Sequence, residues 1–252
     1  MTREADGKPR WRLIALDMDG TVLAESLTIS AGNLAALRDA REAGVHVTFA
    51  TGRMFTGLVQ RYAQELLFTD PIITLNGGAV WSAQGTLLAT HPFSAEQLDG
   101  LRQVAAAAGM DYVPYTAERD QDAAAFLKQD GPWIKCVFGS PSSGEIASMR
   151  RRLEDLGLFE VTNTHPFNIE VNPAGVSKAT ALSVVCRDLG IDPAQVVAMG
   201  DSLNDVAMLR FAGLGVAMEN AADAVKAVAD MVTLHHDADG VAHAIHRVLG
   251  EL

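Results

Sequence analysis

The chain has 252 residues, is 48% hydrophobic and carries a formal net charge of −11. This length suffices for one large domain, or for a core with a second, smaller domain. The negative charge argues against nonspecific binding to nucleic acid or to an anionic membrane, because both require basic patches. An anionic substrate would have to meet local positive charge rather than the field of the whole protein.

The sequence also predicts a reduced protein without membrane spans. Cys136 and Cys186 lie in apolar segments, where buried thiols are expected rather than a disulfide. No apolar run approaches the length of about 18 residues that a membrane span needs. Residues 1–10 are polar and lack the apolar segment of a secretory signal, so we expect a flexible N-terminal tail on a cytoplasmic protein.

The first predicted strand, residues 13–16, is apolar throughout and ends in two carboxylates, Asp17 and Asp19, followed by Gly20. Side chains two residues apart share a face of an extended segment, so both carboxylates can point into one site. Two anions this close need compensation, and Mg²⁺ with oxygen ligands is the obvious candidate. Taken alone, a solvated turn explains the pattern equally well.

A helix over residues 31–43, capped by Ser30, and a strand over 45–50 come next, which predicts a parallel, right-handed βαβ unit. This strand ends in Thr51 and Gly52. Because the carboxyl ends of parallel strands meet at one edge of a sheet, Thr51 should arrive beside Asp17. A hydroxyl followed by a glycine amide suits a phosphate oxygen, although a simple helix cap is an alternative.

A helix over residues 54–67 and a third strand over 71–75 follow, and the strand ends in Asn76, Gly77 and Gly78. The Asn-Gly-Gly run is a strong turn signal. Asn76 could contact a substrate, but a turn-forming asparagine is the safer interpretation.

The alternation of single strands and helices stops between residues 79 and 171. We predict a hairpin over 79–91, helices over 94–108 and 142–156, and strands over 110–115, 134–138, 160–163 and 167–171. Residues 116–132 read as a loop with a short helix. This α+β block differs from the βαβ pattern before it and is interpreted as an inserted domain.

The parallel pattern resumes with a helix that Ser177 caps. Lys178 lies in its first turn, where the helix dipole disfavours a cation, so a nearby anion is indicated, with a solvated lysine as the alternative. A strand over residues 196–199 then ends in a second acidic cluster that contains Asp201, Asn204 and Asp205. Helix capping would explain Asp205 but not Asp201. Strands over 213–218 and 230–234 and helices over 221–229 and 240–249 complete the chain.

Together these motifs resemble those of the haloacid dehalogenase (HAD) superfamily. The four motifs, in order, are Asp17-Met18-Asp19-Gly20-Thr21, Thr51, Lys178 and Gly200-Asp201-Ser202-Leu203-Asn204-Asp205. The run Asn76-Gly77-Gly78 and the stretch 169–178 are similar to the Cof-type subgroup with an α/β cap, although Gly78 replaces the usual alanine. The resemblance implies an α/β fold with a Rossmann-like, doubly wound parallel core (residues 11–78 and 172–252) and an inserted α+β cap (79–171).

The resemblance also implies a Mg²⁺-dependent phosphatase that acts on small phosphate monoesters, including sugar phosphates. Asp17 would be the nucleophile and Asp19 the general acid/base. The metal ligands would be Asp17, Asp201 and the backbone carbonyl of Asp19. Thr51, Gly52, Lys178 and Asn204 would hold the phosphate, and Asp205 would orient Lys178 or a metal-bound water. In the cap, Tyr112, Tyr115, Lys135 and Asn168 are candidates for reading the leaving group, with packing favoured for the tyrosines.

Two alternatives stay open at this point. A phosphohexomutase uses the same motifs but needs several cationic cap residues, and the run Arg150-Arg151-Arg152 looks more like a solvated helix face. A phospho-accepting regulatory module is less favoured, because such domains have roughly half this length. We expect a small phosphorylated metabolite as partner, with no nucleic acid and no membrane. The substrate and the oligomeric state remain open.

Overall fold

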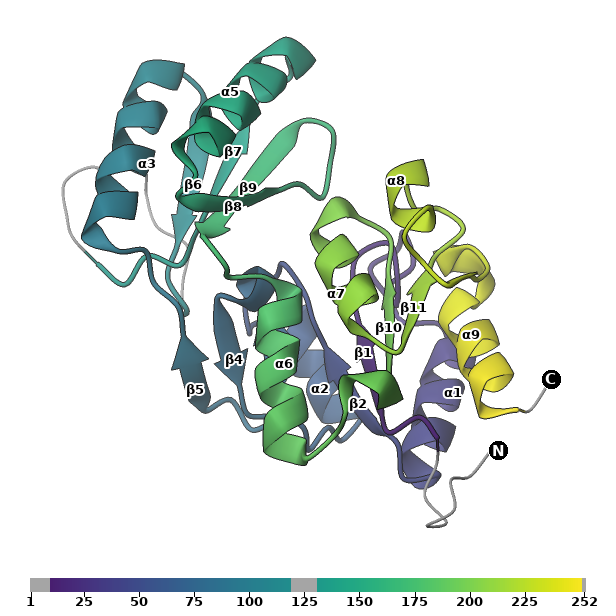
Figure 1. The fold of residues 1–252 in the computed structure, drawn as a ribbon. Helices are drawn as coiled ribbons and strands as arrows, with labels where there is room; N and C mark the ends of the chain where they lie inside the picture. Colours follow the sequence, from purple (N-terminus) through teal and green to yellow (C-terminus); the bar gives the residue numbers. More distant parts are fainter. Residues whose placement is uncertain (1–9, 119–130, 251–252) are drawn as a thin grey trace.

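The computed structural model describes residues 10–118 and 131–250. Its centre is a parallel sheet with the strand order β12-β11-β10-β1-β2 (Figure 1). The strands are β1 (Leu13–Leu16), β2 (His46–Phe49), β10 (Val196–Gly200), β11 (Leu214–Ala217) and β12 (Met231–Val232). A parallel sheet of this kind confirms the predicted α/β core.

Helices cover both faces of the sheet, because alternate residues of the buried strands point to opposite sides. Ile14 and Leu16 of β1 pack against one helical layer, and Leu13 and Ala15 pack against the other. The first layer contains α1 (Ala31–Glu42), α2 (Leu58–Glu65) and α9 (Gly240–Leu249), and the second contains α6 (Lys178–Leu189) and α7 (Val206–Phe211). The doubly wound arrangement is therefore as expected.

The register of the strands decides which loops meet. Leu16 at the end of β1 lies opposite Met199 of β10 and Phe49 of β2. The three strands run in parallel and stop at the same level. The loops that begin at residues 17, 50 and 201 therefore emerge side by side at one edge of the sheet.

The hairpin predicted over residues 79–91 belongs to a small three-stranded sheet that meets the core sheet at one bridge. Strand β3 (Ile72–Thr74) reaches the end of β2 through a parallel bridge between Ala50 and Ile73. It pairs with β4 (Ala79–Trp81), which in turn pairs with β5 (Leu87–Thr90), both antiparallel. The division of the chain at residues 78/79 and 171/172 stays a prediction.

A separate, four-stranded antiparallel sheet with the order β6-β7-β9-β8 forms the part that we call the cap. Its strands are β6 (Asp111–Tyr115), β7 (Lys135–Gly139), β8 (Phe159–Thr162) and β9 (Asn168–Pro173). Helices α3 (Ala95–Ala108) and α5 (Ser143–Leu156) cover the face turned away from the core (Figure 1). Cys136, Phe138, Ile169 and Val171 pack beneath these helices. The alternate residues, Lys135, Val137, Asn168 and Glu170, lie on the opposite face.

Several elements match the sequence closely, whereas others are shorter than predicted, among them β12, which covers two of the residues 230–234. Ser30 caps α1 through its side chain, and α9 has the predicted bounds. Helix α2 begins at Leu58 rather than at residue 54, because the preceding loop ends at Gly57 with φ of +54°. Helix α8 (Asp223–Lys226) is a single turn that no capping side chain begins. Short 3₁₀ turns also occur, among them Leu75–Gly77 and Leu203–Asp205.

Three further predictions concern the cysteines, membrane spans and the segments 1–10 and 116–132. Both cysteines are free and buried, as predicted. No helix in residues 10–118 or 131–250 is long and apolar enough to cross a membrane. Most of the predicted tail, 1–10, and most of the predicted loop and helix at 116–132 lie outside the described residues.

Candidate active site

The deepest part of the site is a buried ammonium between two carboxylates. Lys178 Nζ donates hydrogen bonds to Asp17 Oδ1 over 2.6 Å and to Asp205 Oδ1 over 2.7 Å. Lys178 and Asp205 are fully buried, and Asp17 is 5% exposed. A solvated surface lysine is therefore excluded, and the cation in the first turn of α6 faces anions instead.

Asp205 also holds the loop that carries Asp201. Its Oδ2 atom accepts hydrogen bonds from the backbone amides of Asp201, over 3.0 Å, and Ser202, over 2.9 Å. The Asp201 carboxylate in turn accepts from the hydroxyl of Thr21 over 3.0 Å. A Cβ atom on Gly20 would lie 2.5 Å from Asp201 Oδ2, so glycine is what lets the loop after β1 approach. The two acidic loops thereby become one site.

The carboxylates are poorly neutralised by protein alone. Burial raises the pKa of Asp17, and Asp205 and Asp201 add to that effect while Lys178 opposes it. Burial, followed by repulsion from Asp205, raises the pKa of Asp201 to about 6. Burial opposes the charge on Lys178, but Asp17 and Asp205 outweigh it and raise the pKa of the lysine. One ammonium among three carboxylates leaves room for a further cation.

The donor set fits a hard divalent ion. Carboxylate oxygens of Asp17, Asp201 and Asp205 all lie within 4.8 Å of one another. Mg²⁺ takes oxygen ligands at about 2.0–2.1 Å, so small side-chain movements suffice for Asp17 and Asp201 to share an ion. Asp205 is already engaged by Lys178 and two amides, which makes it a support rather than the best ligand.

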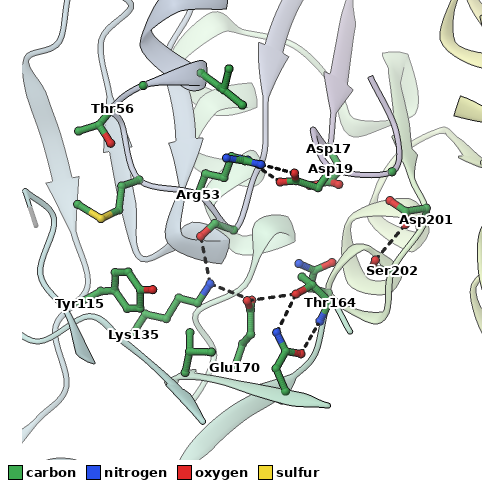
Figure 2. A pocket seen from close by; sticks show the side chains of 18 residues that line it. Asp17, Asp19, Arg53, Thr56, Tyr115, Lys135, Thr164, Glu170, Asp201 and Ser202 are labelled. Atoms are coloured by element: carbon green, nitrogen blue, oxygen red, sulfur yellow. Dashed lines mark hydrogen bonds and ion pairs between the residues drawn. The ribbon is translucent and has the colours of Figure 1, made fainter. Parts of the chain in front are cut away.

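Asp19 lies apart from this group and is held by an arginine that the sequence did not single out. The Arg53 guanidinium donates to both carboxylate oxygens, Nε to Oδ2 over 2.6 Å and Nη2 to Oδ1 over 2.5 Å (Figure 2). The Asp19 side chain is 46% exposed. The hydrogen bond to Asp19 raises the pKa of Arg53 despite partial burial. The only available signal was that Arg53 directly follows Thr51 and Gly52.

The loops after β2, β3 and β10 form the third corner of the site. Thr51 is fully buried and its hydroxyl accepts a hydrogen bond from the backbone amide of Arg53 over 3.1 Å. Asn204 Nδ2 donates to Asn76 Oδ1 over 3.2 Å. Among the described residues, Asn204 Oδ1 is a buried atom without a hydrogen-bond partner. Asn76 is a turn residue, as the sequence favours, and it also contacts a residue of the predicted phosphate site.

A cavity of about 790 Å³ lies between this edge of the core and the polar face of the cap. Figure 2 shows Asp17, Asp19, Arg53 and Asp201 on one side, with Tyr115, Lys135, Thr164 and Glu170 from the cap on the other. Of the four cap candidates, Tyr115, Lys135 and Asn168 line the cavity. Tyr112 does not, and its ring packs on Phe138 at 5.5 Å. Thr164 and Glu170 were missed.

Comparisons with known proteins agree with this geometry. The model of the haloacid dehalogenase-like hydrolases matches residues 14–123 and 114–245. A 5-amino-6-(5-phospho-D-ribitylamino)uracil phosphatase of Bacillus subtilis, YcsE, is 37% identical over 94% of this chain and 96% of its own. A phosphoglycolate phosphatase of Methanopyrus kandleri is 32% identical over 95% and 98%. A crystal structure of a haloacid dehalogenase-like hydrolase from Bacteroides thetaiotaomicron has a TM-score of 0.78 at 30% identity, covering 94% and 99%.

The chain belongs to the haloacid dehalogenase-like hydrolases. Within that family it is a Cof-type phosphatase, a phosphoric monoester hydrolase whose relatives act on phosphorylated small molecules. The family is generally metal-dependent, usually on Mg²⁺, and the acidic group around Asp17 and Asp201 is able to hold such an ion.

The raised pKa of Asp201 predicts how metal binding depends on pH. A proton on Asp201 would exclude Mg²⁺ from that carboxylate, so affinity should fall as pH drops through about 6, and the raised pKa of Asp17 acts in the same direction. Each carboxylate that takes up a proton should contribute up to about a tenfold loss per pH unit. Isothermal titration calorimetry with Mg²⁺ measures this. An affinity that is constant between about pH 5 and pH 7 would contradict it.

Proposed function

We propose that the enzyme hydrolyses phosphate monoesters of small polar metabolites in a Mg²⁺-dependent reaction through an aspartyl-phosphate on Asp17. The observation that carries this proposal is the position of Asp17, which is buried at the end of β1, bonded to Lys178 and within metal-sharing distance of Asp201. A cytoplasmic location and a lack of nucleic-acid or membrane partners stay predictions from the sequence.

In the first step, an Asp17 oxygen attacks phosphorus and the bond from phosphorus to the alcohol oxygen breaks. Asp19 donates a proton to that leaving oxygen. In the second step, water attacks the phosphorus of the aspartyl-phosphate, Asp19 takes a proton from the water, and Asp17 is released together with inorganic phosphate. Bound Mg²⁺ would be held by Asp17, Asp201 and the backbone carbonyl of Asp19, and would neutralise charge on the phosphoryl oxygens.

The remaining core residues would bind the phosphoryl group. Lys178 balances negative charge on Asp17 and on the phosphate, and Asp205 keeps its ammonium in place. Thr51, the amide of Gly52 and the side chain of Asn204 would hold the phosphate oxygens. These contacts supply orientation and charge neutralisation, which are the main requirements of phosphoryl transfer.

The cavity favours a leaving group with hydroxyls and a flat ring. Thr164 and Asn168 offer polar contacts, while Tyr115 and Val137 offer aromatic and apolar ones. The volume of about 790 Å³ exceeds what a bare phosphate needs. We therefore propose, as the finer assignment, a phosphorylated sugar-alcohol chain attached to a pyrimidine, which is the class named for the Bacillus subtilis relative. Simple sugar phosphates are the second candidate.

Hydrolysis is favoured over the mutase alternative by the charge of the cap. Among the described cap residues that line this cavity, Lys135 is the sole cation, and Glu170 already pairs with it at 2.9 Å. A bisphosphate would need a second anion site there. Arg151 and Arg152 are exposed on α5 instead.

A panel of phosphate monoesters, assayed with Mg²⁺ for free phosphate, tests the proposal. It should include 5-amino-6-(5-phospho-D-ribitylamino)uracil, ribitol 5-phosphate and hexose phosphates, with the Asp17→Asn variant as blank. We expect release without any added bisphosphate, and the highest kcat/KM for the ester that carries the ring. Turnover that requires a bisphosphate would make the enzyme a mutase. A panel without release would overturn the proposal.

Arg53 gives a separate prediction about Asp19. Replacing Arg53 by Met removes a bidentate, charge-assisted contact and should lower kcat/KM by about 10- to 100-fold, because Asp19 loses its orientation toward the leaving oxygen. Arg61→Met, at an exposed position on α2, is the matched control. If both variants hydrolyse the best ester within about twofold of each other, Arg53 has no part in orienting Asp19.

A further inference from the structure

The face of the cap that is turned toward the core carries a buried ion pair. Lys135 and Glu170 are 3% and 6% exposed, and Lys135 Nζ lies 2.9 Å from Glu170 Oε2. They project from β7 and β9 on the side opposite the apolar cluster that joins the cap sheet to α3 and α5. The packing of the cap itself therefore does not depend on this pair.

The partners of the ion pair lie in the phosphate corner of the core. Lys135 Nζ donates to the carbonyl oxygen of Gly52 over 3.0 Å, and Asn76 Nδ2 donates to Glu170 Oε2 over 2.6 Å. Asn76 Oδ1 accepts from Asn204 over 3.2 Å. A continuous set of hydrogen bonds thus runs from the cap strands to the loops after β2, β3 and β10. Figure 2 shows its cap end, with Lys135 and Glu170 bonded to each other.

Gly52 has little free space beside its Cα atom, where the ion pair and Asn76 lie. A Cβ atom there would lie 3.0 Å from Asn76 Oδ1, 3.3 Å from Lys135 Nζ and 3.4 Å from Glu170 Oε2. A side chain at this position would therefore crowd the ion pair and Asn76. Asn76 has φ of +58°, a conformation uncommon outside glycine, and its amide group is held at both ends. The pair therefore contacts Asn76, whose backbone conformation is uncommon, and Gly52, which has no side chain to crowd it.

The charges of Lys135 and Glu170 favour a role of this pair in positioning its neighbours rather than in stabilising the fold. Burial opposes ionisation of Glu170, but Lys135 and the hydrogen bond from Asn76 outweigh it, so the pKa of Glu170 is lowered and its carboxylate form is favoured. A buried ion pair adds little stability compared with apolar residues of the same volume, and its best-supported value is a defined arrangement. Here the arrangement involves Gly52, Asn76 and, through Asn76, Asn204.

We propose that Lys135 and Glu170 are positioning residues of the phosphatase reaction, which fix Gly52 and Asn76 in the geometry that receives the phosphoryl group. The phosphate site is then complete only when the cap lies on the core. Phosphate binding and cap placement are coupled, because a ligand that prefers the complete site must also favour the docked cap. This inference rests on the proposed function, in which Gly52 and Asn204 bind phosphate.

Inorganic phosphate is the probe, because it would occupy the phosphate corner of the cavity and carries no leaving group that could contact Tyr115, Thr164 or Asn168. We expect Lys135→Met to raise its inhibition constant by about tenfold or more, the change that follows from losing about 1.4 kcal/mol of hydrogen-bonded positioning. Glu170→Gln keeps the shape of the side chain and should raise the constant less. If Lys135→Met does not fold, Glu170→Gln decides, and an unchanged inhibition constant in the folded variant overturns the proposal.

A charge-swapped variant, Lys135→Glu with Glu170→Lys, separates positioning from simple docking of the cap. It keeps an ion pair, but a carboxylate at position 135 cannot donate to the carbonyl of Gly52. We expect Tm to recover toward wild type while the inhibition constant for phosphate stays raised. Recovery of both would show that any ion pair serves, and would overturn the proposal.

Glu154→Gln is the matched control, since it removes an exposed cap ion pair with Arg150 on α5. The inhibition constant of phosphate for this variant, and the Tm of the variant, should equal those of the wild type. The outcomes also distinguish a failure of the proposed function from a failure of the positioning role. A wild-type enzyme that releases no phosphate from any ester refutes the proposed function. An active wild type whose phosphate inhibition is unchanged by Lys135→Met refutes only the role of the ion pair.

Discussion

Replacing Asp17 by Asn is expected to lower kcat by about 10⁴-fold or more while the chain stays folded. An amide has the shape of the carboxylate but cannot form the aspartyl-phosphate. The buried ammonium of Lys178 keeps Asp205 as its partner, at 2.7 Å, so no unpaired charge results. Steady-state turnover of the best ester and a circular-dichroism melt of the same sample measure the two effects.

The matched control for this variant is Asp39→Asn, at an exposed position on α1. It should have wild-type turnover. Asp17→Asn should still bind inorganic phosphate, because the site loses one negative charge while the other phosphate contacts persist. Retention of more than about a tenth of the wild-type kcat would mean that another group attacks phosphorus.

The second large effect is expected at Lys178. Lys178→Met would leave Asp17 and Asp205 buried without their cation, and uncompensated buried charge destabilises a protein by about 3–5 kcal/mol. Turnover should be lost as well, because charge at the phosphoryl group is no longer balanced. Urea denaturation without Mg²⁺ measures the free energy of unfolding, since bound metal would mask part of the loss.

A double variant shows whether charge is the cause. Adding Asp205→Asn to Lys178→Met removes one of the two stranded carboxylates and should restore part of the stability, but no activity. Lys226→Met, in the short helix α8, is the control and should unfold like the wild type. If Lys178→Met has the free energy of unfolding of the wild type, the buried ion pairs do not carry the energetic role assigned to them.

The core of the site was predictable because its chemistry lies where strands end. Asp17 and Asp201 directly follow β1 and β10, and the parallel register of Leu16 with Met199 brings both to one edge. Lys178 lies in a first helical turn, where a cation is unfavourable, and this position predicted a nearby anion. Each of these inferences needed only local sequence and the geometry of parallel sheets.

The contacts made by Arg53, Asn76 and Glu170 were less accessible. Glu170 reads as an ordinary strand residue, and its proximity to Lys135 follows from the antiparallel pairing of β7 with β9, where it lies opposite Val137. Asn76 gains its role only because the cap meets the loop after β3. Contacts of this kind depend on how two separately folded sheets meet, which no local pattern encodes. The same limit applies to the hairpin β4–β5, which pairs with β3 in a small sheet that a single bridge joins to the core sheet.

The central claim is that Asp17 carries the phosphoryl group during turnover. Its most direct test is to quench the enzyme in mid-reaction with the best ester and Mg²⁺, reduce with borohydride and sequence the peptides by mass spectrometry. An aspartyl-phosphate is reduced to homoserine, and we predict homoserine at position 17 and at no other aspartate. Homoserine at another aspartate, or unmodified Asp17 in an enzyme quenched during rapid turnover, would contradict the account.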